Sequence, residues 1–198
     1  MSNPFKLQAG DIFLLDSNST ESKMVKFLMS SDTIWHWIIG KIYEFFTKKL
    51  APYWLIKPQY YYHVGLIYSD TETIEQQAKV VKMPISRLDG KSYMIIRKIG
   101  LTNLELEALL ANAAIDIGNG YDILLIVGKT LHWLTGIPFF TLLLNLPKKE
   151  LCVTVTAKWV YNTWKELWGR KNYNFVQTDD MYYYAISHPS KYITEKII

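Results

Sequence analysis

Short β-prone segments follow one another in the first half of the chain, and this pattern constrains the fold more than any other feature. β-branched and aromatic residues dominate these segments, and short polar turns separate them. Four segments of this kind lie at residues 60–68, 73–78, 80–83 and 93–98. Short turns join antiparallel strands, whereas parallel strands need long crossovers. The sequence therefore predicts a small antiparallel sheet between Tyr60 and Lys98.

One strand and two helices are predicted outside this region. Ile12–Leu15 is an apolar run typical of a buried strand. Leu101–Ile117 is amphipathic, and Thr102 with Glu105 forms the capping box that commonly begins a helix. Apolar residues recur at helical spacing from Leu151 to Trp168, although the first turns of this segment are β-prone. Together with the sheet, these elements predict an α+β fold.

Length and composition favour one domain. The chain has 198 residues, of which 49% are hydrophobic, so it can bury a core without disulfides and is not a disordered chain. We expect a single domain over residues 1–198, with additional helices in two aromatic or apolar regions at about 21–58 and 121–146. The region 173–198 is expected to be irregular, with at most a short strand or 3₁₀ turn.

Charge and hydropathy exclude several classes of protein. The net charge of +4 is mild and dispersed, which predicts no binding to nucleic acid. The uncharged stretch at 130–146 contains a histidine, a glycine and a proline, and it is shorter than the roughly 20 apolar residues that span a bilayer. The first residues lack the pattern of a secretory signal, and a single cysteine suits a reducing compartment. The predicted location is the cytoplasm.

Cys152 and His63 are the residues to which the sequence points for chemistry. It contains no phosphate-binding glycine loop and no Gly-x-Ser-x-Gly motif, and we predict no cofactor. Cys152 is expected near the start of a helix, where unpaired backbone N–H groups and the helix dipole lower the pKa of a thiol. The same N–H groups can hold an oxyanion. His63 is expected on a strand, and a neutral imidazole can act as a base near neutral pH.

Glu75 is the predicted partner of His63. If the loop between their strands takes residues 68–72, Gly65 lies opposite Glu75, and the carboxylate lies diagonally across from His63 on the same face. A loop with an even number of residues would put the two side chains on opposite faces. Gly65 is also expected to leave open space beside the imidazole.

Each of these three residues also has a structural interpretation. A lone cysteine such as Cys152 is commonly a small buried hydrophobic residue. His63 could be bonded to the backbone, and Glu75 could be a solvated carboxylate on a strand. Cys152 and the scattered histidines lack the spacing of a zinc site, so no metal is predicted.

Several short segments, taken in order, match one family. They are Gly10–Phe13, His63–Ile67, Ile74–Glu75, Tyr93–Arg97, Gly118–Asp122, Glu150–Cys152 and Thr178–Tyr182. This order resembles the circularly permuted branch of the NlpC-type papain-like superfamily, which includes YiiX-like bacterial enzymes and lecithin:retinol acyltransferase-like proteins. The resemblance implies a papain-like fold, in which a small antiparallel sheet packs against the helix that bears the cysteine. It also implies a catalytic triad of Cys152, His63 and Glu75. The match fails directly after Cys152, where Val153–Thr156 replaces the family's usual Ser-Glu-Leu-Val.

Three functions remain as hypotheses. The first is a thiol hydrolase, a cysteine peptidase or amidase, that cleaves an amide in a small or cell-wall-type peptide through an acyl-enzyme. By resemblance, Cys152 attacks the carbonyl, His63 moves the proton and Glu75 orients His63. The second uses the same triad on a lipid ester or thioester, with peripheral membrane contact through the apolar segments at 35–54 and 121–146. The third is a binding domain that has lost catalysis. The sequence leaves this choice and the oligomeric state open.

Overall fold

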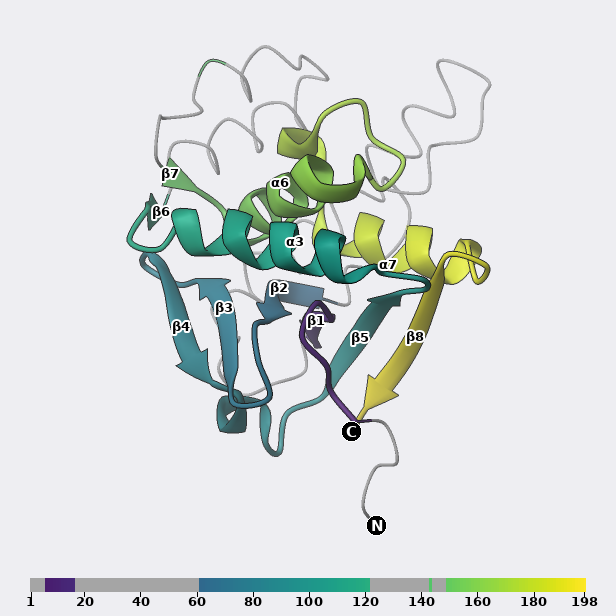
Figure 1. Cartoon of the computed structure of the whole chain (residues 1–198), viewed down its shortest axis with the longest axis horizontal. Helices are drawn as coiled ribbons and strands as arrows, with labels where there is room; N and C mark the ends of the chain where they lie inside the picture. Colours follow the sequence, from purple (N-terminus) through teal and green to yellow (C-terminus); the bar gives the residue numbers. More distant parts are fainter. Residues whose placement is uncertain (1–5, 17–60, 122–142, 144–148) are drawn as a thin grey trace, which may run out of the picture.

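The structure is a computed structural model that describes residues 6–16, 61–121, 143 and 149–198. In this part of the chain, helices cover one face of a six-stranded antiparallel sheet, so the predicted α+β class is confirmed (Figure 1). The helical regions expected at about 21–58 and 121–146 lie almost wholly outside the described residues. The single-domain organisation of residues 1–198 stays a prediction. Within the described ranges, every helix is too short or too polar to cross a bilayer.

The sheet combines strands from both ends of the chain. Its strands are β1 (Ile12–Asp16), β2 (Tyr61–Ile67), β3 (Glu72–Gln76), β4 (Val80–Pro84), β5 (Tyr93–Lys98) and β8 (Tyr192–Ile197). Their order across the sheet is β4-β3-β2-β1-β5-β8, and every neighbouring pair is antiparallel. β1 therefore lies in the middle of the sheet, between β2 and β5.

The expectation of a largely irregular C-terminal region is wrong, although the short strand and the 3₁₀ turn that it allowed are both present. Residues 173–198 contain a short 3₁₀ helix, η3 (Tyr173–Phe175), the helix α7 (Thr178–Ser187) and the strand β8. β8 pairs with β5 along its whole length, and the Thr178 hydroxyl donates to the Tyr61 carbonyl at 2.6 Å. The structure of this region depends on partners far away in the sequence, which local patterns do not reveal.

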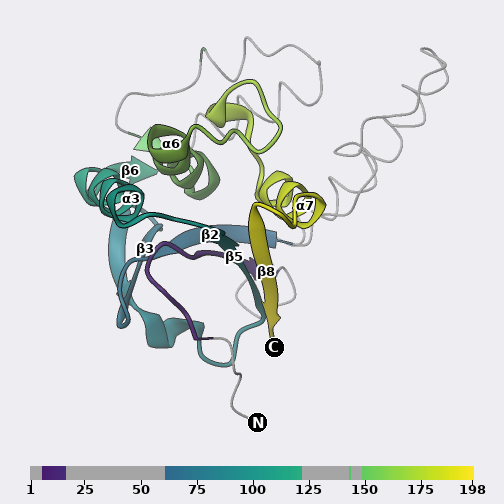
Figure 2. The same ribbon diagram turned by 45° about the vertical axis from the view of Figure 1, so that its right-hand side comes forward.

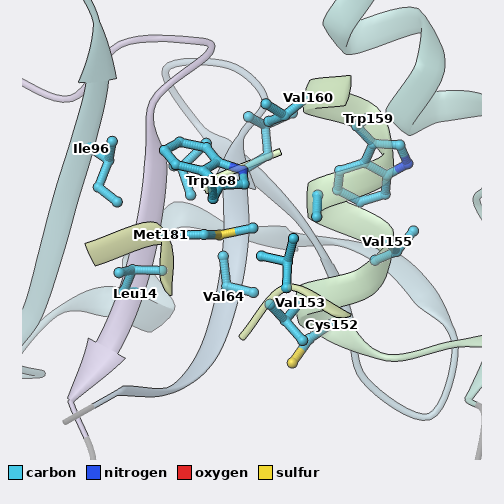
Figure 3. Close-up of a cluster of buried hydrophobic side chains, with 14 of the residues drawn as sticks. Leu14, Val64, Ile96, Cys152, Val153, Val155, Trp159, Val160, Trp168 and Met181 are labelled. Atoms are coloured by element: carbon cyan, nitrogen blue, oxygen red, sulfur yellow. The ribbon is translucent and has the colours of Figure 1, made fainter. Parts of the chain in front are cut away.

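Both faces of the sheet bury apolar side chains. The face toward the helices contributes Leu14, Val64, Leu66, Ile74 and Ile96 to one cluster, together with Leu109, Val155 and Met181 from the helices (Figure 3). The second cluster, on the other face, contains Phe13, Leu15, Ile67, Leu88, Tyr93 and Ile95. Alternate residues of β1 belong to the two clusters, because side chains alternate along a strand. This explains why Ile12–Leu15 is an unbroken apolar run.

The helices α3 (Asn103–Ile115), α6 (Cys152–Trp164) and α7 lie on one side of the sheet (Figure 2). The predicted capping box of α3 is confirmed, with the Thr102 hydroxyl accepting from the N–H of Glu105. α6 ends at Trp164 rather than at the predicted Trp168. Lys165 takes a left-handed conformation with φ 58°, which ends the helix. The apolar spacing continues to Trp168 because its side chain is fully buried in the core.

A short parallel ladder leads the chain into α6. β6 (Gly120–Tyr121) pairs with β7 (Lys149–Glu150), and Gly120 also forms a bridge to Lys79, directly before β4. β7 ends at Glu150, and Leu151 alone separates it from α6. Through this ladder the start of α6 is tied to the start of β4 (Figure 1).

Candidate active site

Cys152 is the first residue of α6, as the sequence predicts. Leu151 before it is extended and offers no side-chain cap, so backbone N–H groups of the first turn are available. The N–H groups of Val153 and, from β2, of Val64 donate hydrogen bonds to the Cys152 sulfur. Figure 3 shows the sulfur pointing away from the labelled apolar side chains. The thiol therefore meets polar groups at the margin of the core.

His63 and Glu75 lie together across β2 and β3. Gly65 pairs with Glu75, which is the register expected for a loop of residues 68–72. His63 Nε2 lies 2.6 Å from Glu75 Oε2, a short hydrogen bond between largely buried side chains. The predicted contact is confirmed, and the interpretation of Glu75 as a solvated carboxylate is wrong, because its side chain is 0% exposed.

The expectation of open space at Gly65 is wrong. A Cβ built on Gly65 would lie 2.5 Å from the Phe13 ring and 2.9 Å from the Glu75 Cβ. Glycine is needed here because the Phe13 ring and Glu75 close in on the backbone of β2. This close packing holds the carboxylate in place beneath His63.

Both carboxylate oxygens of Glu75 accept hydrogen bonds, and one of them also forms an ion pair. Oε1 accepts from the Thr73 hydroxyl at 3.0 Å and pairs with Arg87 Nη1 at 2.8 Å, and Oε2 accepts from Gln77 Nε2 at 3.0 Å as well as from His63. Burial raises the pKa of Glu75, but the hydrogen bond and charge of His63 lower it, and Arg87 and Thr73 lower it further. The overall pKa of Glu75 is below its usual value, so the carboxylate is ionised.

Sequence reasoning missed these three supporting side chains. Thr73 and Gln77 stand two residues on either side of Glu75, and the alternation of a strand could have indicated them. Arg87 comes from η2 (Ile85–Leu88), a 3₁₀ helix after β4, and no local pattern relates it to Glu75.

Cys152 and His63 stabilise each other's charged forms. Burial raises the pKa of the Cys152 thiol, but the charge and hydrogen bond of His63 and the two backbone N–H groups lower it to below its usual value. Burial lowers the pKa of His63, but the charge and hydrogen bond of Cys152, followed by Glu75, raise it to about 9. Because Nε2 is bonded to Glu75, Nδ1 is the ring nitrogen left for the sulfur. Each residue thus favours the charged form of the other, the thiolate of Cys152 and the imidazolium of His63.

The described residues contain no group of three or more His, Cys, Asp or Glu side chains that could hold a metal ion. The site is built instead from one sulfur, one imidazole and one carboxylate in series. Such a series can generate a nucleophile, move a proton and orient the group that moves it.

Comparison with protein-family models and with curated proteins gives no match for this chain. Among solved structures, the chain is similar to the crystal structure of the metalloprotein YiiX from Escherichia coli O157:H7. The two share 18% sequence identity, and the alignment covers 84% of this chain and 71% of that chain, with a TM-score of 0.49. This similarity concerns the course of the backbone and assigns no role to any residue of the site.

Proposed function

We propose that the protein is a cysteine hydrolase of the permuted papain-like kind, which cleaves an amide bond in a small or cell-wall-type peptide. The observation that carries the proposal is the hydrogen-bonded series from Cys152 through His63 to Glu75. Its three members come from a helix start and two adjacent strands, and the carboxylate is held by further buried side chains. The order of the sequence motifs supports the same fold and reaction.

The reaction begins when the Cys152 thiolate attacks the carbonyl carbon, forming a C–S bond and moving the carbonyl π electrons onto oxygen. Backbone N–H groups at the start of α6, including that of Cys152, hold the resulting oxyanion. The His63 imidazolium gives its proton to the leaving nitrogen as the C–N bond breaks, which leaves a thioester on Cys152. Neutral His63 then takes a proton from a water molecule that attacks the thioester. The acid product leaves, and the thiolate and imidazolium are restored.

Alkylation of Cys152 by iodoacetamide, measured from about pH 4 to about pH 10, tests the pair directly. An ordinary thiol titrates near about 8.5, whereas a thiolate paired with His63 reacts well below that pH. We expect a low-pH plateau of reactivity in the wild type that disappears in His63→Ala. A single titration near or above about 8.5 in both proteins would show a structural cysteine and contradict the proposal.

Turnover of a panel of peptide amides, lipid esters and thioesters tests the reaction. We expect amide cleavage that is lost in Cys152→Ala while the far-UV circular dichroism is unchanged. Turnover of lipids alone would favour the acyltransferase alternative, whose motivating segments at 35–54 and 121–146 lie almost wholly outside the described residues. A reactive thiolate without turnover of either class would favour the binding domain.

A further inference from the structure

Gln76, the last residue of β3, is a buried amide with no hydrogen-bond partner. Its side chain is 1% exposed, and neither Nε2 nor Oε1 is bonded to any described residue. A buried amide that lacks partners reduces the stability of the folded protein. A buried polar group without a partner calls for an explanation, and a role in catalysis or in binding a ligand, an ion or a water molecule is one.

The register of β2 with β3 relates Gln76 to Val64, whose N–H is bonded to Cys152. The ladder ends at the pair Gly65 and Glu75, so one further step in this register brings Val64 opposite Gln76. Ile67 donates its N–H to Asp11, next to β1, and N–H directions alternate along a strand, so the Val64 N–H points toward β3. This N–H donates to the Cys152 sulfur instead of continuing the ladder. The sulfur therefore lies where the ladder between β2 and β3 ends, next to the position of Gln76 in this register.

The amide also lies on the same face of the sheet as the thiol. Gln76 alternates with Glu75 and shares its face with Ile74. Ile74, Val64 and Cys152 belong to one core cluster, and Figure 3 shows Val64 next to Cys152. β3 thus carries the His63 partner, Glu75, on one face and Gln76 on the face of the nucleophile. The side chain of the neighbouring Gln77, by contrast, donates a hydrogen bond to Glu75.

We propose that the Gln76 side chain binds an amide group of the substrate next to Cys152, and that it selects amides over esters. The inference rests on the proposed hydrolase function. Gln76 offers a free donor, Nε2, and a free acceptor, Oε1. A substrate amide satisfies both, because it carries a carbonyl oxygen and an N–H. An ester has no N–H and leaves Oε1 unpaired in a buried place, which is the kind of mismatch that gives strong discrimination.

Two small alkylating reagents test this selection without knowledge of the natural substrate. Chloroacetamide and methyl chloroacetate both form a C–S bond with the Cys152 thiolate and release chloride, but only the first carries amide N–H groups. We expect Gln76→Met to lower the ratio of the amide rate constant to the ester rate constant about tenfold relative to wild type. Gln8→Met, which changes an exposed glutamine, is the matched control and leaves the ratio unchanged.

Thermal unfolding supplies a second readout. Methionine has a similar size without hydrogen-bonding groups, so Gln76→Met is expected to raise the Tm by about 2–4 °C. A fall in Tm, or failure of the variant to fold, would show that the amide stabilises the fold and would overturn the inference. An equal change in both rate constants would overturn it as well.

The pH profile of alkylation separates this inference from the proposed function. If the low-pH plateau persists in Gln76→Met while the amide-to-ester ratio equals that of wild type, the role of Gln76 is wrong and the hydrolase proposal stands. If wild-type Cys152 titrates as an ordinary thiol, the hydrolase proposal is wrong, whatever the ratio in Gln76→Met shows.

Discussion

Glu75 carries a negative charge inside the protein, and Arg87, Thr73 and Gln77 hold it there. Its charge raises the pKa of His63, which in turn lowers the pKa of Cys152. The pKa of the thiol is thus influenced by a carboxylate that lies two side chains away from the sulfur. In the proposed reaction Glu75 is a positioning residue, because it acts on the thiol only through the imidazole.

Glu75→Gln removes this charge with little change in size. We expect the alkylation profile of Cys152 to move to higher pH, because the imidazolium is less favoured, and amide turnover to fall about 100-fold. Alkylation rates across pH, together with turnover, measure both effects. Glu72→Gln, on the same strand with a side chain that is 42% exposed, is the control. An unchanged alkylation profile in Glu75→Gln would mean that the charge plays no part.

The shifted pKa values of Cys152 and His63 also make stability depend on pH. Unfolded cysteine and histidine titrate near about 8.5 and about 6.5. His63, with its pKa raised to about 9, contributes stability that is full below about 6.5 and lost as the pH rises through about 9. Cys152, with a lowered pKa, contributes stability that is full above about 8.5 and lost as the pH falls. The two slopes cancel between about 6.5 and about 8.5.

Urea unfolding of the wild type and of the double variant Cys152→Ala, His63→Ala measures this contribution. The difference in unfolding free energy is expected to be largest and flat between about pH 6.5 and about pH 8.5, and to decrease on both sides. A difference that does not vary between about pH 5 and about pH 10 would show that the pair is uncharged in the folded protein.

At the scale of the element, α6 is a helix because it is buried. Its first turns, Val153–Thr156, consist of β-branched residues with modest helix propensity, yet all four are buried against the sheet. Thr156 is fully buried, and its hydroxyl has no hydrogen-bond partner among the described residues. Packing against the core therefore outweighs both local propensity and an unpaired hydroxyl.

Thr156→Val replaces this hydroxyl with a methyl group. We expect the variant to be more stable by about 1 kcal/mol, because an unpaired buried polar group is removed. Chemical denaturation measures the difference. Thr163→Val is the control on the same helix, where the hydroxyl donates to the Trp159 carbonyl at 2.9 Å, and that variant should lose stability. Lower stability in Thr156→Val would show that the hydroxyl is bonded.

The elements that the sequence predicts well are those with local causes. The capping box of α3 and the start of α6 follow from residues close together in the chain, and the register of β2 with β3 is one of the two that the sequence left open. α7 and β8 could not be predicted in this way. The N-cap of α7 is Gln177, an unusual capping residue, and β8 is defined by its pairing with β5. The contact of Arg87 with Glu75 and the burial of Gln76 likewise depend on the folded sheet and could not be predicted from local sequence.

At the scale of the whole molecule, the sheet is completed by the last strand in the sequence. β8 covers the edge of β5 and buries Tyr192 against the core. Without it, the backbone groups of β5 would form an open edge. The described part of the chain thus depends on its final residues for a closed core.

Deletion of residues 192–198 tests this dependence. We expect a lower Tm and self-association, because the β5 edge is uncovered and the Tyr192 contacts are lost. Differential scanning fluorimetry and size-exclusion chromatography with light scattering measure the two effects. Deletion of Ile198 alone, which lies outside β8 and is 97% exposed, should change neither. An unaltered Tm in the longer deletion would contradict the role of β8.

The central position of β1 in the sheet has a consequence for folding during synthesis on the ribosome. Residues 12–16 are synthesised long before either neighbour, since β2 ends at Ile67 and β5 ends at Lys98. Cys152 emerges later still, and the sheet closes only with β8. A nascent chain therefore carries His63 and Glu75 before Cys152 has been made. The lowered pKa of Cys152 arises only once the segment that follows β7 has been synthesised and packed against β2.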